Sequence, residues 1–121
     1  MIPRPLRIAA FVLACGVIAW LSLSPTTALP QVSMSDKIEH AIAYFALTLV
    51  GAYAFQPRLV RLAIGLFLGG GGVEILQASM GLGRNGDPAD AVANSLGIAA
   101  GLLVTLAIGE LIKVKSPAGG E

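Results

Sequence analysis

The sequence AVANSLGIAAGLLVTLAIGELI, from Ala91 to Ile112, contains a single charged residue near its end. A helix rises ~1.5 Å per residue, so this stretch is long enough to cross a hydrocarbon layer of ~30 Å. Three further apolar stretches precede it, at about Leu6–Leu23, Glu39–Phe55 and Leu59–Ser79. The pattern predicts an all-α fold, an integral membrane four-helix bundle that forms one domain over residues 1–121.

The composition supports a membrane protein and argues against other classes. The chain is 55% hydrophobic and 12% charged, with a mean hydropathy of +0.80. Soluble domains have about 25% charged residues. The single cysteine, Cys15, lies in the first apolar stretch and cannot form an intrachain disulfide. No basic run or nucleic-acid motif is present, so we expect membrane lipids as partners and no nucleic acid.

The basic residues predict the orientation. Six of the eight belong to one end of the spans: Arg4, Arg7, Arg58, Arg61, Lys113 and Lys115. Only Lys37 and Arg84 belong to the other end. Cytoplasmic segments are rich in Lys and Arg, so both termini are expected inside (N-in/C-in) and the loops 24–38 and 80–90 outside. The expected location is the inner membrane of the cell, as a multi-pass protein.

The acidic residues show the opposite distribution. Five of the seven belong to the outer half: Asp36, Glu39, Glu74, Asp87 and Asp90. Glu74 lies ~7 Å inside the outer end of its span, where a charge in lipid costs at least ~2.5–3.5 kcal/mol, so it must face protein or water. The acidic residues form either a solvated rim or a site that prefers a cationic or metal-bearing ligand.

Polar residues recur at helical spacing in the second span. Asp36, His40 and Tyr44 follow i, i+4, i+8 and form one stripe, with Lys37 beside it. His40 is a candidate acid/base or ligand, and its alternative is a hydrogen-bonded packing residue. The alternative role for Tyr44 is that of an aromatic ring that lies at the membrane interface and positions His40.

The third and fourth spans carry similar faces. Gln77 follows Glu74 at i+3, and in the fourth span one face holds Asp87, Asp90, Asn94, Gly97 and Gly101. We expect the Asn94 amide to hydrogen-bond across helices. Small residues let membrane helices approach closely, and we expect such close packing along this face. We expect the same at the Gly65-x-x-x-Gly69 spacing of the third span. The run Gly69–Gly72 in that span also permits a kink.

Opposite helix directions bring these residues to one depth, which predicts a polar pocket near the outer surface. Its candidate residues are Asp36, Lys37, His40, Tyr44, Glu74, Gln77, Arg84, Asp87, Asp90 and Asn94. Structural alternatives stay open: helix capping for Asp87 and Asp90, interhelical bonds for Gln77 and Asn94, and a bond from Glu74 to Arg84 or Lys37.

The ordered motifs resemble one known family. They are Asp36-Lys37-x-x-His40-x-x-x-Tyr44, then Glu74-x-x-Gln77, then Arg84-x-x-Asp87-x-x-Asp90-x-x-x-Asn94-x-x-Gly97. This combination, over about Ser24 to Gly101, resembles the VanZ-like family. The resemblance implies a small helical membrane protein of the bacterial cell envelope. The founding member of the family is associated with resistance to the antibiotic teicoplanin.

Two classes of function follow from the pocket. In the first, it binds a lipid headgroup, a cell-wall precursor or a glycopeptide without chemistry. In the second, the protein is a membrane-embedded enzyme in which His40, with Asp36 or Glu74, is a general acid/base pair and Arg84 holds an anionic headgroup. No nucleophilic Ser or Cys beside a base is evident, which favours binding. His40, Glu74 and Asp90 are suitable metal ligands, but no spacing motif supports a metal site, so we predict no metal and no cofactor. The sequence leaves the ligand and the oligomeric state open.

Overall fold

Four helices account for nearly all of the chain that the structure describes. The structure is a computed structural model that describes residues 2–23, 36–80 and 88–115. The helices are α1 (Arg4–Leu23), α2 (Asp36–Phe55), α3 (Leu59–Met80) and α4 (Pro88–Lys115). All four are long and apolar enough to cross a membrane, which confirms the all-α expectation. Most extend a few residues past the predicted apolar stretches, because polar residues at the ends of the spans are also helical.

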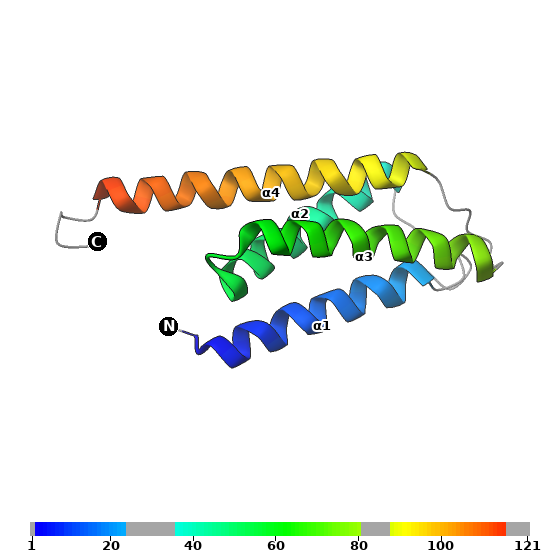
Figure 1. The fold of residues 1–121 in the computed structure, drawn as a ribbon, viewed down its shortest axis with the longest axis horizontal. Helices are drawn as coiled ribbons and strands as arrows, with labels where there is room; N and C mark the ends of the chain where they lie inside the picture. Colours follow the sequence, from blue (N-terminus) through cyan, green and yellow to red (C-terminus); the bar gives the residue numbers. More distant parts are fainter. Residues whose placement is uncertain (1, 24–35, 81–87, 116–121) are drawn as a thin grey trace.

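The helices alternate in direction (Figure 1). α1 and α3 run one way and α2 and α4 run the other, so that the first turn of α1 and the last turn of α4 lie at the same end of the bundle. α2 and α3 are joined at that end by a short turn in which the Arg58 amide donates a hydrogen bond to the carbonyl oxygen of Phe55, at 2.7 Å. At this end of the bundle, called the terminal end below, lie Arg4, Arg7, Arg58 and Arg61, whereas Lys37 lies at the opposite end.

The closest helix pair is α2 with α4, and glycines make this approach possible. A Cβ atom on Gly97 would meet the carbonyl oxygen of Ala41, and one on Gly101 would lie 2.6 Å from Cβ of Thr48. Both glycines are buried. The expected seam of small residues along α4 is therefore present, and it brings the two backbones together.

The glycines of α3 differ from the expectation. The helix continues without interruption through the run of four glycines, Gly69–Gly72. A Cβ atom on Gly65 or Gly69 would meet no described atom within 4 Å, so the expected close packing at the Gly65-x-x-x-Gly69 spacing is wrong. The glycine of α3 that touches another helix is Gly70. Gly65 and Gly69 instead line a cavity.

This cavity has a volume of about 570 Å³, lies between α1, α2 and α3, and is partly open to the outside of the bundle. Its walls are mostly apolar and include Phe11 and Ile18 of α1, Leu47 of α2 and Val73 of α3. No residue of α1 is buried among those whose side chains the structure describes. α1 is therefore the least tightly packed of the four helices, and the space between it and its neighbours is large enough for a ligand.

Large apolar side chains cover the outside of the bundle. Leu13 is 70% exposed, Val60 73%, Ile75 69% and Leu103 68%. Such residues occur on all four helices, and continuous exposed apolar surface is characteristic of proteins that interact with a membrane. Together with the length of the helices, this surface is compatible with a membrane protein.

Candidate functional site

Five polar side chains from three helices meet near the end of the bundle opposite the termini. We call them the polar cluster: Lys37 and His40 of α2, Glu74 of α3, and Asp90 and Asn94 of α4. Asp90 and Asn94 are each only 3% exposed. A buried carboxylate and a buried amide both need partners, because burying a polar group without a hydrogen bond costs free energy.

Lys37 satisfies one oxygen of Asp90. Its Nζ lies 2.7 Å from Oδ1 of Asp90, and it donates a hydrogen bond within an ion pair. The Lys37 side chain is 42% exposed whereas that of Asp90 is 4% exposed. The ammonium group thus lies at the edge of the site while the carboxylate lies inside it.

His40 lies between Asn94 and Asp90 on α4. Its Nδ1 lies 2.9 Å from Oδ1 of Asn94, and an amide oxygen can only accept, so Nδ1 donates this hydrogen bond. Its Nε2 lies 3.6 Å from Oδ2 of Asp90. When the ring is neutral, this tautomer keeps the lone pair on Nε2, directed at the Asp90 side of the site.

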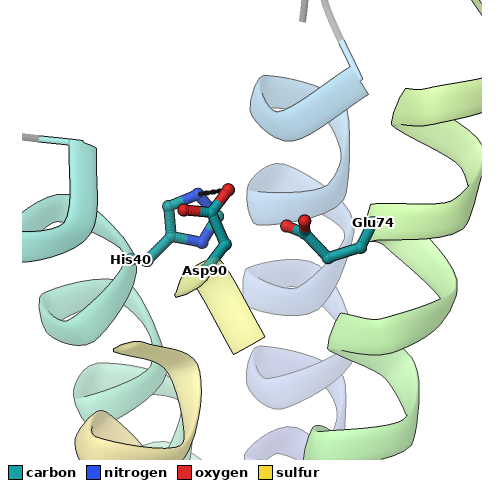
Figure 2. A group of neighbouring side chains, drawn as sticks. All are labelled: His40, Glu74 and Asp90. Carbon is teal, nitrogen blue, oxygen red and sulfur yellow. Dashed lines mark ion pairs between the residues drawn. The ribbon is translucent and has the colours of Figure 1, made fainter. Parts of the chain in front are cut away.

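Glu74 reaches the cluster from α3 because Gly70 lets that helix come close. A Cβ atom on Gly70 would lie 2.9 Å from Nδ2 of Asn94 and 3.0 Å from Oη of Tyr44. Glu74 is one helical turn further along the same face of α3. Figure 2 shows its side chain extending toward the pair formed by His40 and Asp90. Each of these three residues offers an atom within 4.8 Å of the atoms offered by the other two.

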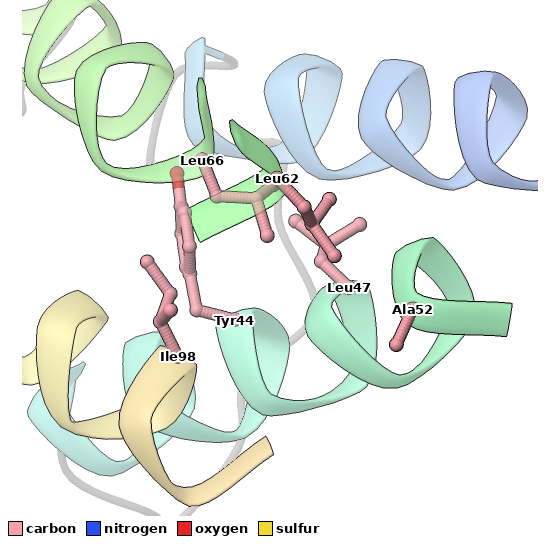
Figure 3. Close-up of a cluster of buried hydrophobic side chains, with 6 residues drawn as sticks. All are labelled: Tyr44, Leu47, Ala52, Leu62, Leu66 and Ile98. Atoms are coloured by element: carbon pink, nitrogen blue, oxygen red, sulfur yellow. The ribbon is translucent and has the colours of Figure 1, made fainter. Parts of the chain in front are cut away.

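Tyr44 forms the floor of the polar cluster. The residue is 7% exposed and belongs to the buried apolar group of Leu47, Leu62, Leu66 and Ile98 (Figure 3). The alternative of a ring at the membrane interface is therefore wrong, because the close approach of α3 covers this ring. Tyr44 also lines the apolar cavity.

The remaining sequence candidates are not part of the described cluster. The backbones of Asp36 and Gln77 are helical, but their side chains are outside the described part of the structure. Arg84 and Asp87 lie outside the described residues altogether. Lys37, one of the two partners considered for Glu74, forms an ion pair with Asp90.

Gly70 is the site residue that the sequence reading missed. The available signal was its spacing from Glu74, because residues at i and i+4 lie on one helix face. A larger residue at position 70 would push against the ends of the Asn94 and Tyr44 side chains.

No family model, no curated protein and no solved structure matches this chain. The functional argument therefore depends on the geometry of the cluster and of the cavity beneath it. The cluster combines an ammonium group, two carboxyl groups, an imidazole and an amide in a space mostly shielded from solvent. Such a set can bind the polar part of a ligand, exchange protons with it, or bind a metal ion.

Proposed function

We propose that this protein binds one amphiphilic lipid or lipid-linked cell-wall precursor, with the apolar tail in the cavity and the headgroup at the polar cluster. One observation carries the proposal: Tyr44 and Gly70 belong both to the wall of the cavity and to the floor of the cluster. An apolar space of about 570 Å³ thus lies next to a group of charged and polar side chains, with Tyr44 and Gly70 between the two. A ligand with one apolar and one polar part matches both regions at once.

The charges of the cluster suggest the chemistry of the headgroup. The two carboxylates of Glu74 and Asp90 accept hydrogen bonds, and Lys37 offsets only one of their charges. Headgroups that carry hydroxyl or ammonium donors complement this arrangement better than a bare anion. Lipids with sugar or amine groups are therefore the preferred class over an acidic headgroup, and a glycopeptide without a lipid tail would leave the cavity unused.

The location and family form part of the same proposal. The distribution of basic residues supports a multi-pass protein of the bacterial inner membrane, with both termini in the cytoplasm and the polar cluster near the outer surface. Membership in the VanZ-like family is proposed from the ordered motifs. Support comes from the meeting of His40, Glu74, Asp90 and Asn94, which belong to three separate motif segments.

Lipid extraction from the purified protein tests the binding proposal. The protein is isolated in mild detergent, and the bound lipids are identified by mass spectrometry. We expect about one amphiphile per chain in the wild type and its loss in Gly69→Leu, because the new side chain fills the cavity. Gly72→Leu is the matched control, because Gly72 is exposed, has no described atom within 4 Å of a Cβ and does not line the cavity.

Two results would contradict this proposal. One is equal lipid retention by Gly69→Leu and Gly72→Leu in folded protein. The other is loss of the lipid in a variant with Gln at Arg58 and Arg61, which line the far end of the cavity, together with full retention in Asp90→Asn. That outcome would place the headgroup at the terminal end of the bundle.

A second candidate function is an enzyme that acts on the same class of lipid. The observation in its favour is the orientation of His40, whose Nδ1 is held by Asn94 while Nε2 faces Asp90. A histidine with a fixed tautomer beside a carboxylate is suited to general acid/base catalysis. Incubation with labelled envelope lipids distinguishes the two functions: product formation that is lost in His40→Gln supports an enzyme, and ligand retention without turnover supports a binding protein.

A further inference from the structure

We infer that His40, Glu74 and Asp90 form a binding site for one divalent transition-metal ion, with zinc as the best match. The three residues come from three different helices, and each offers a nitrogen or oxygen atom within 4.8 Å of the others. No sequence spacing indicates this site, because it exists only when α2, α3 and α4 are packed together. The inference goes beyond lipid binding and does not depend on it.

The distance between His40 and Asp90 fits a tetrahedral ion. Zinc bonds to nitrogen and oxygen of ~2.0–2.2 Å imply edges of ~3.3–3.6 Å between the ligand atoms of a tetrahedron. Nε2 of His40 and Oδ2 of Asp90 are 3.6 Å apart, which matches one such edge. Glu74 offers the third ligand atom, within 4.8 Å of the other two. Three protein ligands leave a fourth position for water or for an oxygen of a bound molecule.

The surroundings of the ligands support the same conclusion independently. Histidines that bind metals usually donate their second ring nitrogen to an oxygen, and carboxylate ligands are usually hydrogen-bonded in turn. His40 donates from Nδ1 to Asn94 at 2.9 Å, which leaves Nε2 as the ligand atom. Asp90 accepts from Lys37 through Oδ1 at 2.7 Å, and its other oxygen, Oδ2, faces His40.

The charge and the ligand types indicate which ions would bind. Two carboxylates and one ammonium leave the cluster with one net negative charge when His40 is neutral, which a divalent cation would more than offset. Imidazole favours zinc and its neighbours among the transition metals over magnesium and calcium, which prefer oxygen ligands alone. We therefore expect zinc to bind and magnesium to compete poorly.

Titration of the whole chain in detergent tests the site. The protein is treated with a chelator, freed of lipid and titrated with zinc by calorimetry, and metal content is measured after gel filtration. We expect one zinc per chain, unchanged by a large excess of magnesium. Cobalt(II) serves as a spectroscopic probe, because a tetrahedral site gives intense visible absorption and an octahedral one does not.

Variants show whether the three residues are the ligands. Glu74→Gln and His40→Gln keep the size of the side chain, and each should weaken zinc binding by more than the ~10–100-fold typical of outer partners. Asn94→Ala, which removes a positioning residue, should weaken it by about 10–100-fold. Glu39→Gln is the matched control, because Glu39 is a half-buried carboxylate of α2 outside the three-residue set. Circular dichroism and gel filtration identify the variants that remain folded.

The inference is overturned if the wild type binds less than one zinc per chain, if magnesium displaces zinc at similar concentrations, or if Glu39→Gln and Glu74→Gln lose zinc equally. If Glu74→Gln does not fold, the cobalt spectrum of the wild type and the zinc affinity of His40→Gln decide the question. Because the titration is done without lipid, a failure of lipid binding leaves its result unaffected.

Discussion

Nδ1 of His40 donates a hydrogen bond to Oδ1 of Asn94 across the interface between α2 and α4, over 2.9 Å. This bond determines which ring nitrogen faces the acidic residues. The tautomer is therefore a property of the packed bundle and not of the histidine alone. It is also measurable, because His40 is the only histidine in the chain.

The first prediction concerns this tautomer. With 15N-labelled histidine and at a pH where the ring is neutral, NMR correlations should show the hydrogen on Nδ1. In Asn94→Leu the acceptor is absent, and we expect the Nδ1–H form to lose its preference. A wild-type spectrum with the hydrogen on Nε2 would contradict the assignment of the hydrogen bond and would weaken the metal-site inference with it.

The second prediction concerns the ion pair between Lys37 and Asp90. Breaking a buried pair by removing one partner costs about 3–5 kcal/mol, but Lys37 is 42% exposed, so solvent screening lowers the expected cost. We expect Lys37→Met to lower the free energy of unfolding in micelles by about 1–2 kcal/mol. A double-mutant cycle with Asp90→Asn should give a coupling energy of about 0.5–1.5 kcal/mol.

The control for this cycle is Glu39→Gln, a charge change in the same turn of α2 without a role in the pair. Its coupling to Lys37→Met should be close to zero. A cycle between Lys37 and Asp90 that also gives zero would mean that the two side chains do not interact in the folded protein.

The third prediction concerns membrane topology. In a Cys15→Ser background, a cysteine introduced at Ala28 or Asn85 should react with a membrane-impermeant maleimide applied to intact cells. A cysteine at Gln56, in the exposed turn between α2 and α3, should react only after the membrane is opened. The physical reason is the retention of Arg4, Arg7 and most other basic residues on the cytoplasmic side. The reverse labelling pattern would mean that the polar cluster faces the cytoplasm.

Much of the fold could be predicted from the sequence because membrane helices have simple requirements. A stretch such as Ala91–Ile112 has too few polar residues for a solvated surface and enough length to span a bilayer. The helical spacing of Asp90 and Asn94, and that of His40 and Tyr44, correctly predicted which residues share a face. These regularities depend only on the geometry of one helix at a time.

What could not be predicted depends on how helices pack against one another. The sequence does not specify the rotation of α3, so it could not show that Gly70, rather than Gly65 or Gly69, makes the contact. For the same reason the ion pair of Asp90 with Lys37 was not anticipated, since helix capping explained Asp90 equally well. The apolar cavity could not be predicted either, because a space between helices has no corresponding pattern in the sequence of a single helix.

The fourth prediction uses the glycines to test this packing. Gly97→Ala places a methyl group against the carbonyl oxygen of Ala41, and a backbone atom cannot move aside without separating α2 from α4. Overpacking of this kind costs about 1–3 kcal/mol or more, so we expect a clear loss of stability. Gly65→Ala is the matched control, because a Cβ there meets no described atom within 4 Å. Alanine has the higher helix propensity by about 1 kcal/mol, so this control should be neutral or slightly stabilising in thermal unfolding. Equal effects of the two substitutions would show that α2 and α4 are not in close contact, and the polar cluster could not then form, because Lys37 and His40 would no longer reach Asp90 and Asn94.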